Sequence, residues 1–165
     1  MKMELIQPFI NAADAVLAET LQCPTKIGDV AMEEEAYRRK GTAAIINIEG
    51  DIQGRVIFDL DGATAAKVAG YLAGEAVSES ADIVRETVFE LANQIIGNAV
   101  TTLNDQGFRF KISPPSLLTS ELGEKSNAEQ EALVMCFDTA NGSVYMNIAM
   151  RYNRRRRQER AVVAG

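Results

Sequence analysis

Residues 86–99 read Glu86-Thr-Val-Phe-Glu90-Leu-Ala-Asn93-Gln-Ile-Ile-Gly97-Asn-Ala. This stretch lies inside a longer helical pattern that Ser78 or Ser80 can cap and that ends at about Asn104. At about 100° per residue, the apolar positions form one core stripe: Val84, Val88, Leu91, Ile95, Ala99 and Leu103. The opposite face carries Glu86, Glu90, Asn93 and Gly97. We therefore predict a long amphipathic helix with an exposed polar face.

Two residues of this polar face are unusual in the middle of a helix. Asn93 is a mediocre helix former, and Gly97 costs about 1 kcal/mol relative to alanine. Gly97 faces outward, so close packing against this protein's own sheet does not explain it. A bare patch one turn from Asn93 would let a partner approach closely. The alternative is an ordinary solvated face, on which Glu86 and Glu90 are surface acids and Gly97 is merely tolerated.

The composition indicates one folded domain without histidine chemistry. The chain has 165 residues, 47% of them hydrophobic, which is enough for a sizeable core. No apolar run approaches the roughly 18 residues of a membrane span, and Glu4 and Pro8 interrupt the region where a signal peptide has its apolar segment. We therefore expect a cytoplasmic protein. The absence of histidine excludes Ser-His and Cys-His catalysis and removes the commonest metal ligand.

Charge is distributed unevenly along the chain. The net charge is −6, but residues 151–165 hold six arginines and one glutamate, so residues 1–150 carry −11. An acidic body argues against nucleic-acid binding by the domain. We expect a domain over residues 1–152 and an Arg-rich, disordered tail over residues 153–165. The alternative is a tail that binds anionic partners such as nucleic acid or a membrane surface.

Apolar periodicity and turn residues predict three helices and six strands. The helices are expected over residues 4–21, 61–72 and 80–104, and the strands over residues 25–32, 43–48, 52–60, 108–112, 132–137 and 144–151. Residues 33–41 and 120–130 are expected to be polar loops. Glu49-Gly50-Asp51 and Asn141-Gly142 indicate two hairpins. Two hairpins in this order of elements predict an α+β domain with a largely antiparallel sheet.

Single residues mark the ends of the shorter elements. Asp61 can cap the short helix, and Gly74 ends it. Gly107 stands where a left-handed residue is expected after the long helix. Pro114-Pro115 ends the strand that follows.

The residues around the long helix resemble a known family. Glu90-Leu-Ala-Asn93 has the Glu-x-x-Asn spacing of the CheC/CheX/FliY chemotaxis phosphatases. Its continuation Gln-Ile-Ile-Gly-Asn-Ala, the later Ile-Ser-Pro-Pro-Ser, and Gly50-Asp-Ile-Gln-Gly54-Arg-Val-Ile-Phe are most similar to the CheX group. The resemblance covers roughly residues 4–150. It implies a CheC-like fold, in which helices pack on a mostly antiparallel sheet of about six strands and a long exposed helix carries the site.

Some residues depart from the family pattern. Glu86 stands where the family usually has Asp or Ser, and Pro114 and Pro115 come one or two residues early. The N-terminal helix has Glu4-Leu-Ile-Gln7 and no clear second motif, so we expect one site per chain. These departures leave open a non-catalytic alternative, a receiver-binding adaptor or motor-associated module with the same fold.

The resemblance implies a phosphatase that dephosphorylates the phospho-aspartate of a CheY-like response regulator. Asn93 would orient the attacking water and Glu90 would pair with a lysine of the partner, while Glu86 and Gly97 would contact the partner. No metal or cofactor of its own is expected, because the partner receiver domain would hold Mg²⁺. The resemblance also implies a homodimer, and we expect no membrane or nucleic-acid partner.

Overall fold

The computed structural model describes residues 3–33, 37–119 and 132–153. The helices are α1 (Met3–Leu21), α2 (Gly62–Ala73) and α3 (Asp82–Asp105). The strands are β1 (Lys26–Glu33), β2 (Gly41–Gly50), β3 (Ile52–Asp61), β4 (Phe110–Ile112), β5 (Ser116–Leu117), β6 (Ala132–Thr139) and β7 (Gly142–Tyr152). This order confirms the prediction and adds the short β5 after the two prolines. The predicted loop over residues 120–130 and residues 154–165 of the predicted tail lie outside the described residues.

All the described strands form one antiparallel sheet. Their order is β1-β6-β7-β3-β2-β4, and β5 also pairs with β2. Both predicted hairpins are present, as β2–β3 and β6–β7. The second turn is displaced by one residue, because Gly142 already pairs with Thr139 and leaves Ala140 and Asn141 as the turn residues.

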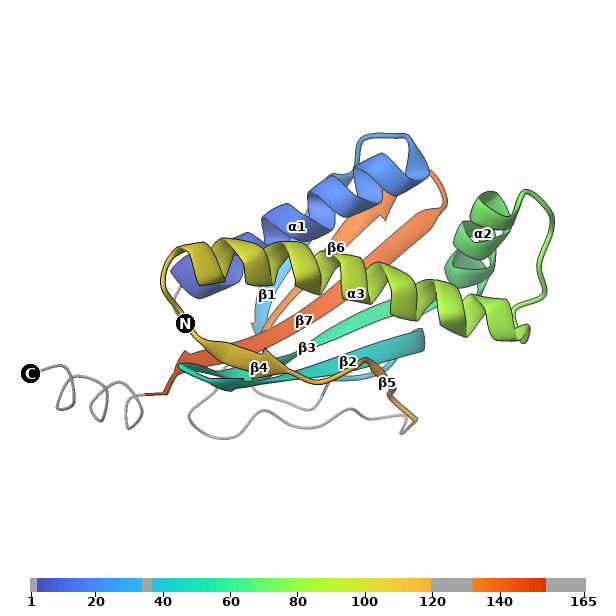
Figure 1. The fold of residues 1–165 in the computed structure, drawn as a ribbon. Helices are drawn as coiled ribbons and strands as arrows, with labels where there is room; N and C mark the ends of the chain where they lie inside the picture. The colour runs from blue at the N-terminus through green and yellow to red at the C-terminus, as the bar shows by residue number, and fades with distance from the viewer. Residues whose placement is uncertain (1–2, 34–36, 120–131, 154–165) are drawn as a thin grey trace, which may run out of the picture.

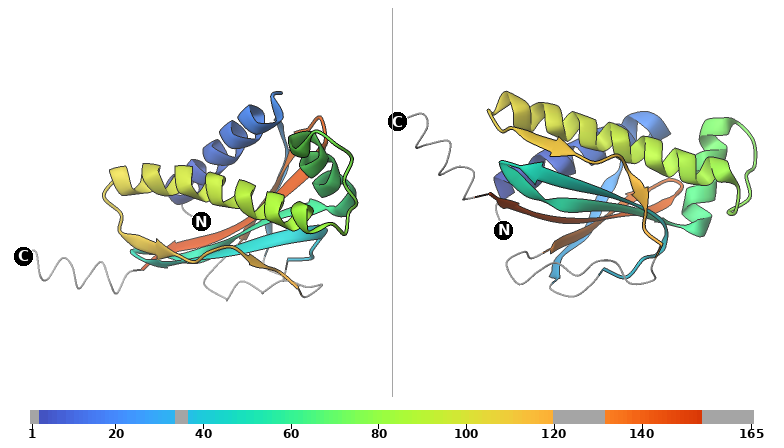
Figure 2. Two further views of the ribbon diagram at one scale, coloured as in Figure 1. Left: turned by 45° about the vertical axis from the view of Figure 1, so that its right-hand side comes forward. Right: turned by 60° about the horizontal axis from the view of Figure 1, so that its bottom comes forward.

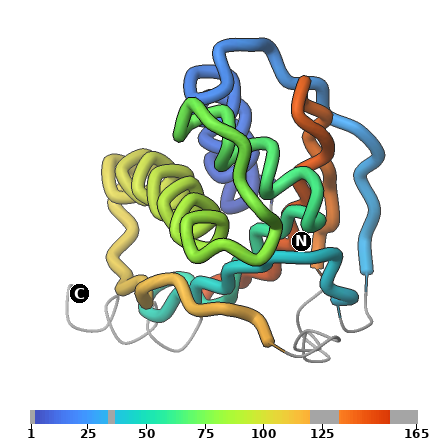
Figure 3. The backbone as a smooth tube through the Cα atoms, turned by 90° about the vertical axis from the view of Figure 1, so that its right-hand side faces the viewer, coloured from blue at the N-terminus to red at the C-terminus, as the bar shows by residue number. Residues whose placement is uncertain are grey.

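The three helices cover one face of this sheet (Figures 1 and 2). α1 and α3 lie side by side, with α2 near the N-terminal end of α3 (Figure 3). Every residue of the predicted core stripe of the long helix is buried, as are alternate residues of β2 and β3 below it, such as Ile46, Ile48, Val56 and Phe58. The apolar residues that recur with period 3.6 in the helix and with period 2 in the strands thus form one shared core. This core holds α3 in place.

A smaller apolar cluster lies on the other face of the sheet. It contains Tyr37, which is only 2% exposed, although residues 33–41 were predicted to be a charged loop. The Tyr37 hydroxyl donates a 2.8 Å hydrogen bond to the carboxylate of buried Asp59 on β3. The backbone N–H groups of Lys40 and Gly41 donate to the same carboxylate. Within this predicted loop the burial of Tyr37 has no local signal, because its hydrogen-bond partner lies 22 residues away in sequence.

The helix ends follow the sequence signals in part. Asp61 caps α2 by accepting a 2.8 Å bond from the Thr64 N–H, as predicted. Gly74 and Gly107 both have positive φ, as expected for left-handed positions. The predicted serine cap of the long helix was wrong, since the N-cap of α3 is Ala81, which has no capping side chain. The hydroxyls of Ser78 and Ser80 lie 3.1 Å from each other instead.

Candidate functional site

α3 presents the predicted site residues on its outer face. Glu86, Glu90, Asn93 and Gly97 are all exposed, while Val88, Leu91 and Ile95 between them are buried. The prediction of their orientation is confirmed. Their chemical roles stay predictions. Because the buried stripe anchors α3 along its length, these exposed side chains extend from a rigid support.

Glu90 and Asn93 lie close together on this support. Their spacing of three residues places them about 4.5 Å apart along the axis and about 60° apart around it. The Gln94 side-chain amide donates a 3.3 Å hydrogen bond to Glu90 Oε1. Gln94 was not among the predicted site residues, although its i, i+4 spacing from Glu90 is a usable signal. This contact restrains the carboxylate next to Asn93.

Gly97 leaves open space one turn after Asn93. A Cβ atom built on Gly97 meets no atom within 4 Å, so packing within the described chain does not require glycine there. Its φ lies in the ordinary helical range, since Gly97 is not among the residues with positive φ. Because Gly97 has no side chain, the backbone of α3 is accessible at this point, and no contact within the described chain requires a glycine there.

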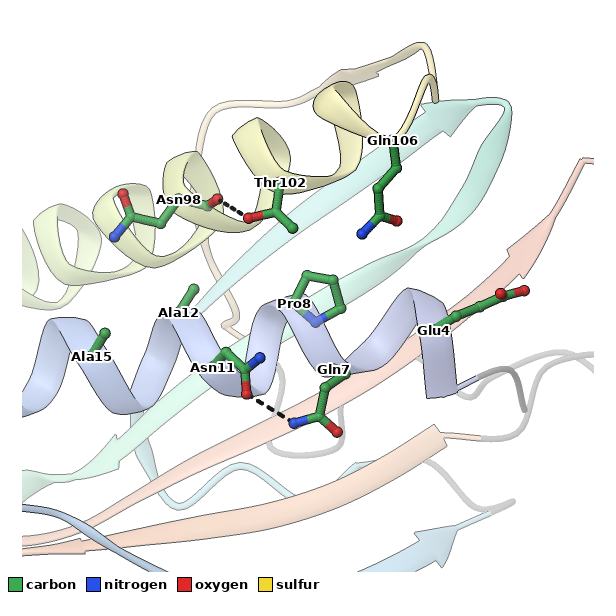
Figure 4. A pocket seen from close by; sticks show the side chains of 9 residues that line it. All are labelled: Glu4, Gln7, Pro8, Asn11, Ala12, Ala15, Asn98, Thr102 and Gln106. Carbon is green, nitrogen blue, oxygen red and sulfur yellow. Dashed lines mark hydrogen bonds between the residues drawn. The ribbon is translucent and has the colours of Figure 1, made fainter.

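A pocket of about 620 Å³ lies between α1 and α3, away from the predicted site (Figure 4). It is lined by residues of α1, of α3 and of the C-cap of α3, most of them small or polar: Glu4, Gln7, Pro8, Asn11, Ala12, Ala15, Asn98, Thr102 and Gln106. Asn98 lies about 140° around α3 from Asn93. None of the four predicted site residues lines this pocket. The candidate site is thus a convex helix face.

The described residues include no group of three or more His, Cys, Asp or Glu side chains that could hold a metal ion. The expected absence of a resident metal stays a prediction. Across the described ranges, no helix is long and apolar enough to cross a membrane. An exposed face with two carboxylates and an amide can attract a cationic group and orient a water molecule. Such a face is open to a docking partner.

Comparison with known proteins identifies the family. The family model described as chemotaxis phosphatase CheX matches residues 42–138, which is more than half of the chain and includes all of α3. The chain belongs to the CheX family. Glu86, Glu90, Asn93 and Gly97 all lie inside the matched segment. The comparison with curated proteins gives no match.

Solved structures share the fold. A CheC-like protein from Shewanella sp. PV-4 has a TM-score of 0.80 and 20% identity over 92% of this chain and 99% of that chain. CheX from Vibrio vulnificus has a TM-score of 0.76 and 20% identity over 90% and 99%. A chain of the CheX–CheY–BeF3–Mg²⁺ complex from Borrelia burgdorferi has a TM-score of 0.71 and 34% identity over 91% and 99%. The predicted CheC-like fold is confirmed.

Proposed function

We propose that this CheX-family chain dephosphorylates the phospho-aspartate of a CheY-like response regulator. The observation that carries the proposal is the exposed pair Glu90 and Asn93 on a helix anchored by its buried stripe. The family match and the relative from Borrelia burgdorferi, whose structure contains CheY, support a receiver domain as the partner. The convex site fits such a partner, since the partner must supply the concave part of the active site.

Asn93 is the residue that orients the attacking water. Phosphoryl hydrolysis depends mainly on positioning and electrostatics. The water oxygen bonds to phosphorus as the bond between phosphorus and the aspartyl oxygen breaks. The products are aspartate and inorganic phosphate, and at neutral pH the phosphate carries the protons of the water. An amide both donates and accepts hydrogen bonds, so Asn93 can hold that water in line. A receiver that carries Mg²⁺ neutralises the phosphoryl charge, and this chain then needs no metal of its own.

Glu90 pairs with a lysine of the receiver and fixes the orientation of docking. A carboxylate–ammonium pair is charge-assisted and shorter than a neutral hydrogen bond. Gln94 supports this role by bonding to Glu90 Oε1. Glu86 adds negative charge one turn earlier, and Gly97 lets the receiver approach the helix backbone. We place this activity in the cytoplasm and in the domain of residues 1–152.

The expected homodimer is best explained by the β1 edge of the sheet. β1 ends the strand order among the described residues, and its Ile27, Val30 and Met32 are 44%, 53% and 48% exposed. Such an edge is a template for pairing with another strand. Antiparallel pairing of two copies about the middle of β1 would place Lys26 of each copy opposite Glu33 of the other. We propose that two chains join their sheets at this edge.

One assay separates the proposed phosphatase from its non-catalytic alternative. Phosphate release from a phosphorylated CheY is measured with and without this protein, together with binding of the two proteins. A phosphatase accelerates release, and Asn93→Ala removes the acceleration. A receiver-binding adaptor would bind CheY and leave the rate of release unchanged.

A further inference from the structure

Apolar side chains lie uncovered along the sheet edge next to α3. Ile112 at the end of β4 is 40% exposed and Leu117 in β5 is 39% exposed. Pro114 between them is also exposed. A single exposed leucine is ordinary, but two large aliphatic side chains and a proline within six residues form a patch. We call Ile112, Pro114 and Leu117 the β4–β5 patch.

The strand register shows which way this patch points. Ile112 is paired with Ile48 and Leu117 with Ala44. Both partners belong to the core under the helices, and directly opposed residues of paired strands point to the same face. Ile112 and Leu117 therefore point to the helix-covered side of the sheet. They stay exposed because α3 packs over β2 and β3, leaving the β4–β5 edge outside its cover.

Asn93 projects from the flank of α3 that lies above this edge. α1 occupies the opposite flank, where Asn98 and Thr102 line the α1–α3 pocket (Figure 4). The view along α3 shows α1 on one side of the helix and the segment with β4 and β5 beneath it (Figure 3). Since Asn93 lies about 140° around the helix from Asn98, it faces away from α1 and lies on the flank of the outer face that is nearer the patch.

Asn93 and the patch also lie at the same level along the helix. The chain reverses after α3, so residues 110–117 run back beneath it (Figure 1). Asn93 lies about 18 Å from Asp105 at 1.5 Å per residue. An extended chain covers a similar distance in about five residues, which leads from Phe110 to about Pro115. The patch therefore lies beside the middle of the polar face.

We infer that the β4–β5 patch is the apolar half of the surface on which the receiver domain docks. This inference rests on the proposed function and names the second contact of the same site. A typical interface covers about 800 Å² per partner, or a disc of about 16 Å radius. A receiver whose phospho-aspartate reaches Asn93 therefore also overlies the patch.

The chemistry of the two halves differs. Glu86, Glu90 and Asn93 supply charge and hydrogen bonds, which give orientation and a fast encounter. They bury little apolar surface, and apolar anchors carry much of the affinity of a protein interface. The receiver must therefore present apolar side chains next to its phosphorylation site, where they cover Ile112 and Leu117.

The test compares serine substitutions in the β4–β5 patch with one at an exposed apolar residue outside it. Ile112→Ser and Leu117→Ser, alone and combined, are assayed for Kd toward the organism's own CheY loaded with Mg²⁺ and beryllium fluoride, a phosphoryl analogue. Met3→Ser is the matched control, because Met3 is a 50% exposed apolar residue at the start of α1, away from both edges of the sheet. If serine destabilises β4, Ile112→Thr keeps the β-propensity and gives the same test.

The combined variant is expected to raise Kd about tenfold or more, because some tens of Å² of apolar surface stay in water. Its kcat with phosphorylated CheY stays within about twofold, since Asn93 is unchanged, and the ratio of its Kd to that of the wild type does not change with salt. Met3→Ser leaves Kd unchanged. A Kd within twofold of the wild type for the combined variant overturns the inference.

The two proposals fail in different ways. If the wild type binds CheY without accelerating phosphate release, the hydrolysis proposal is rejected, and the Kd values still decide the role of the patch. If the wild type binds no CheY of the organism, both are rejected.

Discussion

Glu90 and Asn93 project from one exposed face of α3, three residues apart and about 60° apart around its axis. The helix fixes their spacing, so both reach a docked partner as one unit and lose little freedom on docking. Their chemistry differs, because a carboxylate attracts cations while an amide both donates and accepts hydrogen bonds. Mutations should therefore separate an effect on affinity, due to Glu90, from an effect on rate, due to Asn93.

Asn93→Ala is expected to reduce the accelerated release of phosphate by about 100-fold or more, because the attacking water loses its orienting group. The fold stays intact, since Asn93 is exposed and alanine is the better helix former, by up to about 0.7 kcal/mol. Phosphate release and thermal unfolding are measured on the same sample. Asn98→Ala is the matched control, as an exposed asparagine on the other flank of α3. Activity like that of the wild type in Asn93→Ala would rule out water positioning.

Glu90→Lys is expected to weaken binding to CheY and to lower the rate at subsaturating CheY. The variant replaces the proposed attraction to a lysine of the receiver with a repulsion, which costs on the order of 2 kcal/mol or more, or over tenfold in Kd. The loss shrinks at high salt, because the charges are exposed and screened. Titration calorimetry at two salt concentrations measures both effects. A Kd and rate equal to those of the wild type would reject the proposed pairing.

Gly97 should show opposite effects on stability and on binding. Gly97→Ala is expected to stabilise the protein by about 1 kcal/mol, because the new Cβ meets no atom within 4 Å and the helix loses a glycine. Gly97→Phe is expected to fold as well but to bind CheY at least tenfold more weakly, since the ring fills the space that the partner needs. Chemical denaturation and Kd measurements check the two variants. Undiminished binding by Gly97→Phe would show that the partner does not approach there.

The sequence was sufficient to predict the site helix, because its signal is local and repeated. Val84, Val88 and Leu91 begin a stripe with the period of a helix, and the same periodicity orients Glu90 and Asn93. The same helical phase also predicted that packing against the protein's own sheet does not require glycine at position 97. The periodic pattern thus determined both the element and its exposed face.

Features that depend on distant pairing could not be predicted in this way. Tyr37 is buried because its hydroxyl reaches Asp59 on another element. Ile112 has the alternation of a strand residue that points to the core, yet it is exposed because β4 lies at an edge of the sheet. Strand order is a property of the whole sheet, so no local window around Ile112 contains it.

Tyr37→Phe is expected to destabilise the fold by about 1–3 kcal/mol at neutral pH, because the buried Asp59 carboxylate loses a donor. Burial raises the pKa of Asp59, and its hydrogen bonds, including the one from Tyr37, oppose this rise. A raised pKa means that Asp59 favours folding most at acidic pH and that this contribution is lost as pH rises through the folded-state pKa. The variant raises that pKa further, so its destabilisation grows with pH.

Urea unfolding of Tyr37→Phe at about pH 4, near the ordinary pKa of an aspartate, and at about pH 8 measures this trend. Tyr145→Phe is the matched control, because Tyr145 is the cross-strand neighbour of Asp59 but shares no hydrogen bond with it. Equal destabilisation at both pH values would show that Tyr37 contributes by packing alone.

Glu33→Lys is expected to convert the proposed homodimer to a monomer at micromolar concentration. In the antiparallel pairing of two β1 strands, each Lys26 faces Glu33 of the other copy, and the variant replaces both attractions with repulsions. The combined variant Lys26→Glu, Glu33→Lys restores the opposite charges and should restore the dimer. Light scattering measures the mass of all three proteins, and CheY binding, which we propose at the other edge of the sheet, is expected to stay unchanged. A wild-type monomer would remove the dimer itself, and a dimer that persists in Glu33→Lys would show that the copies pair in another register or on another surface.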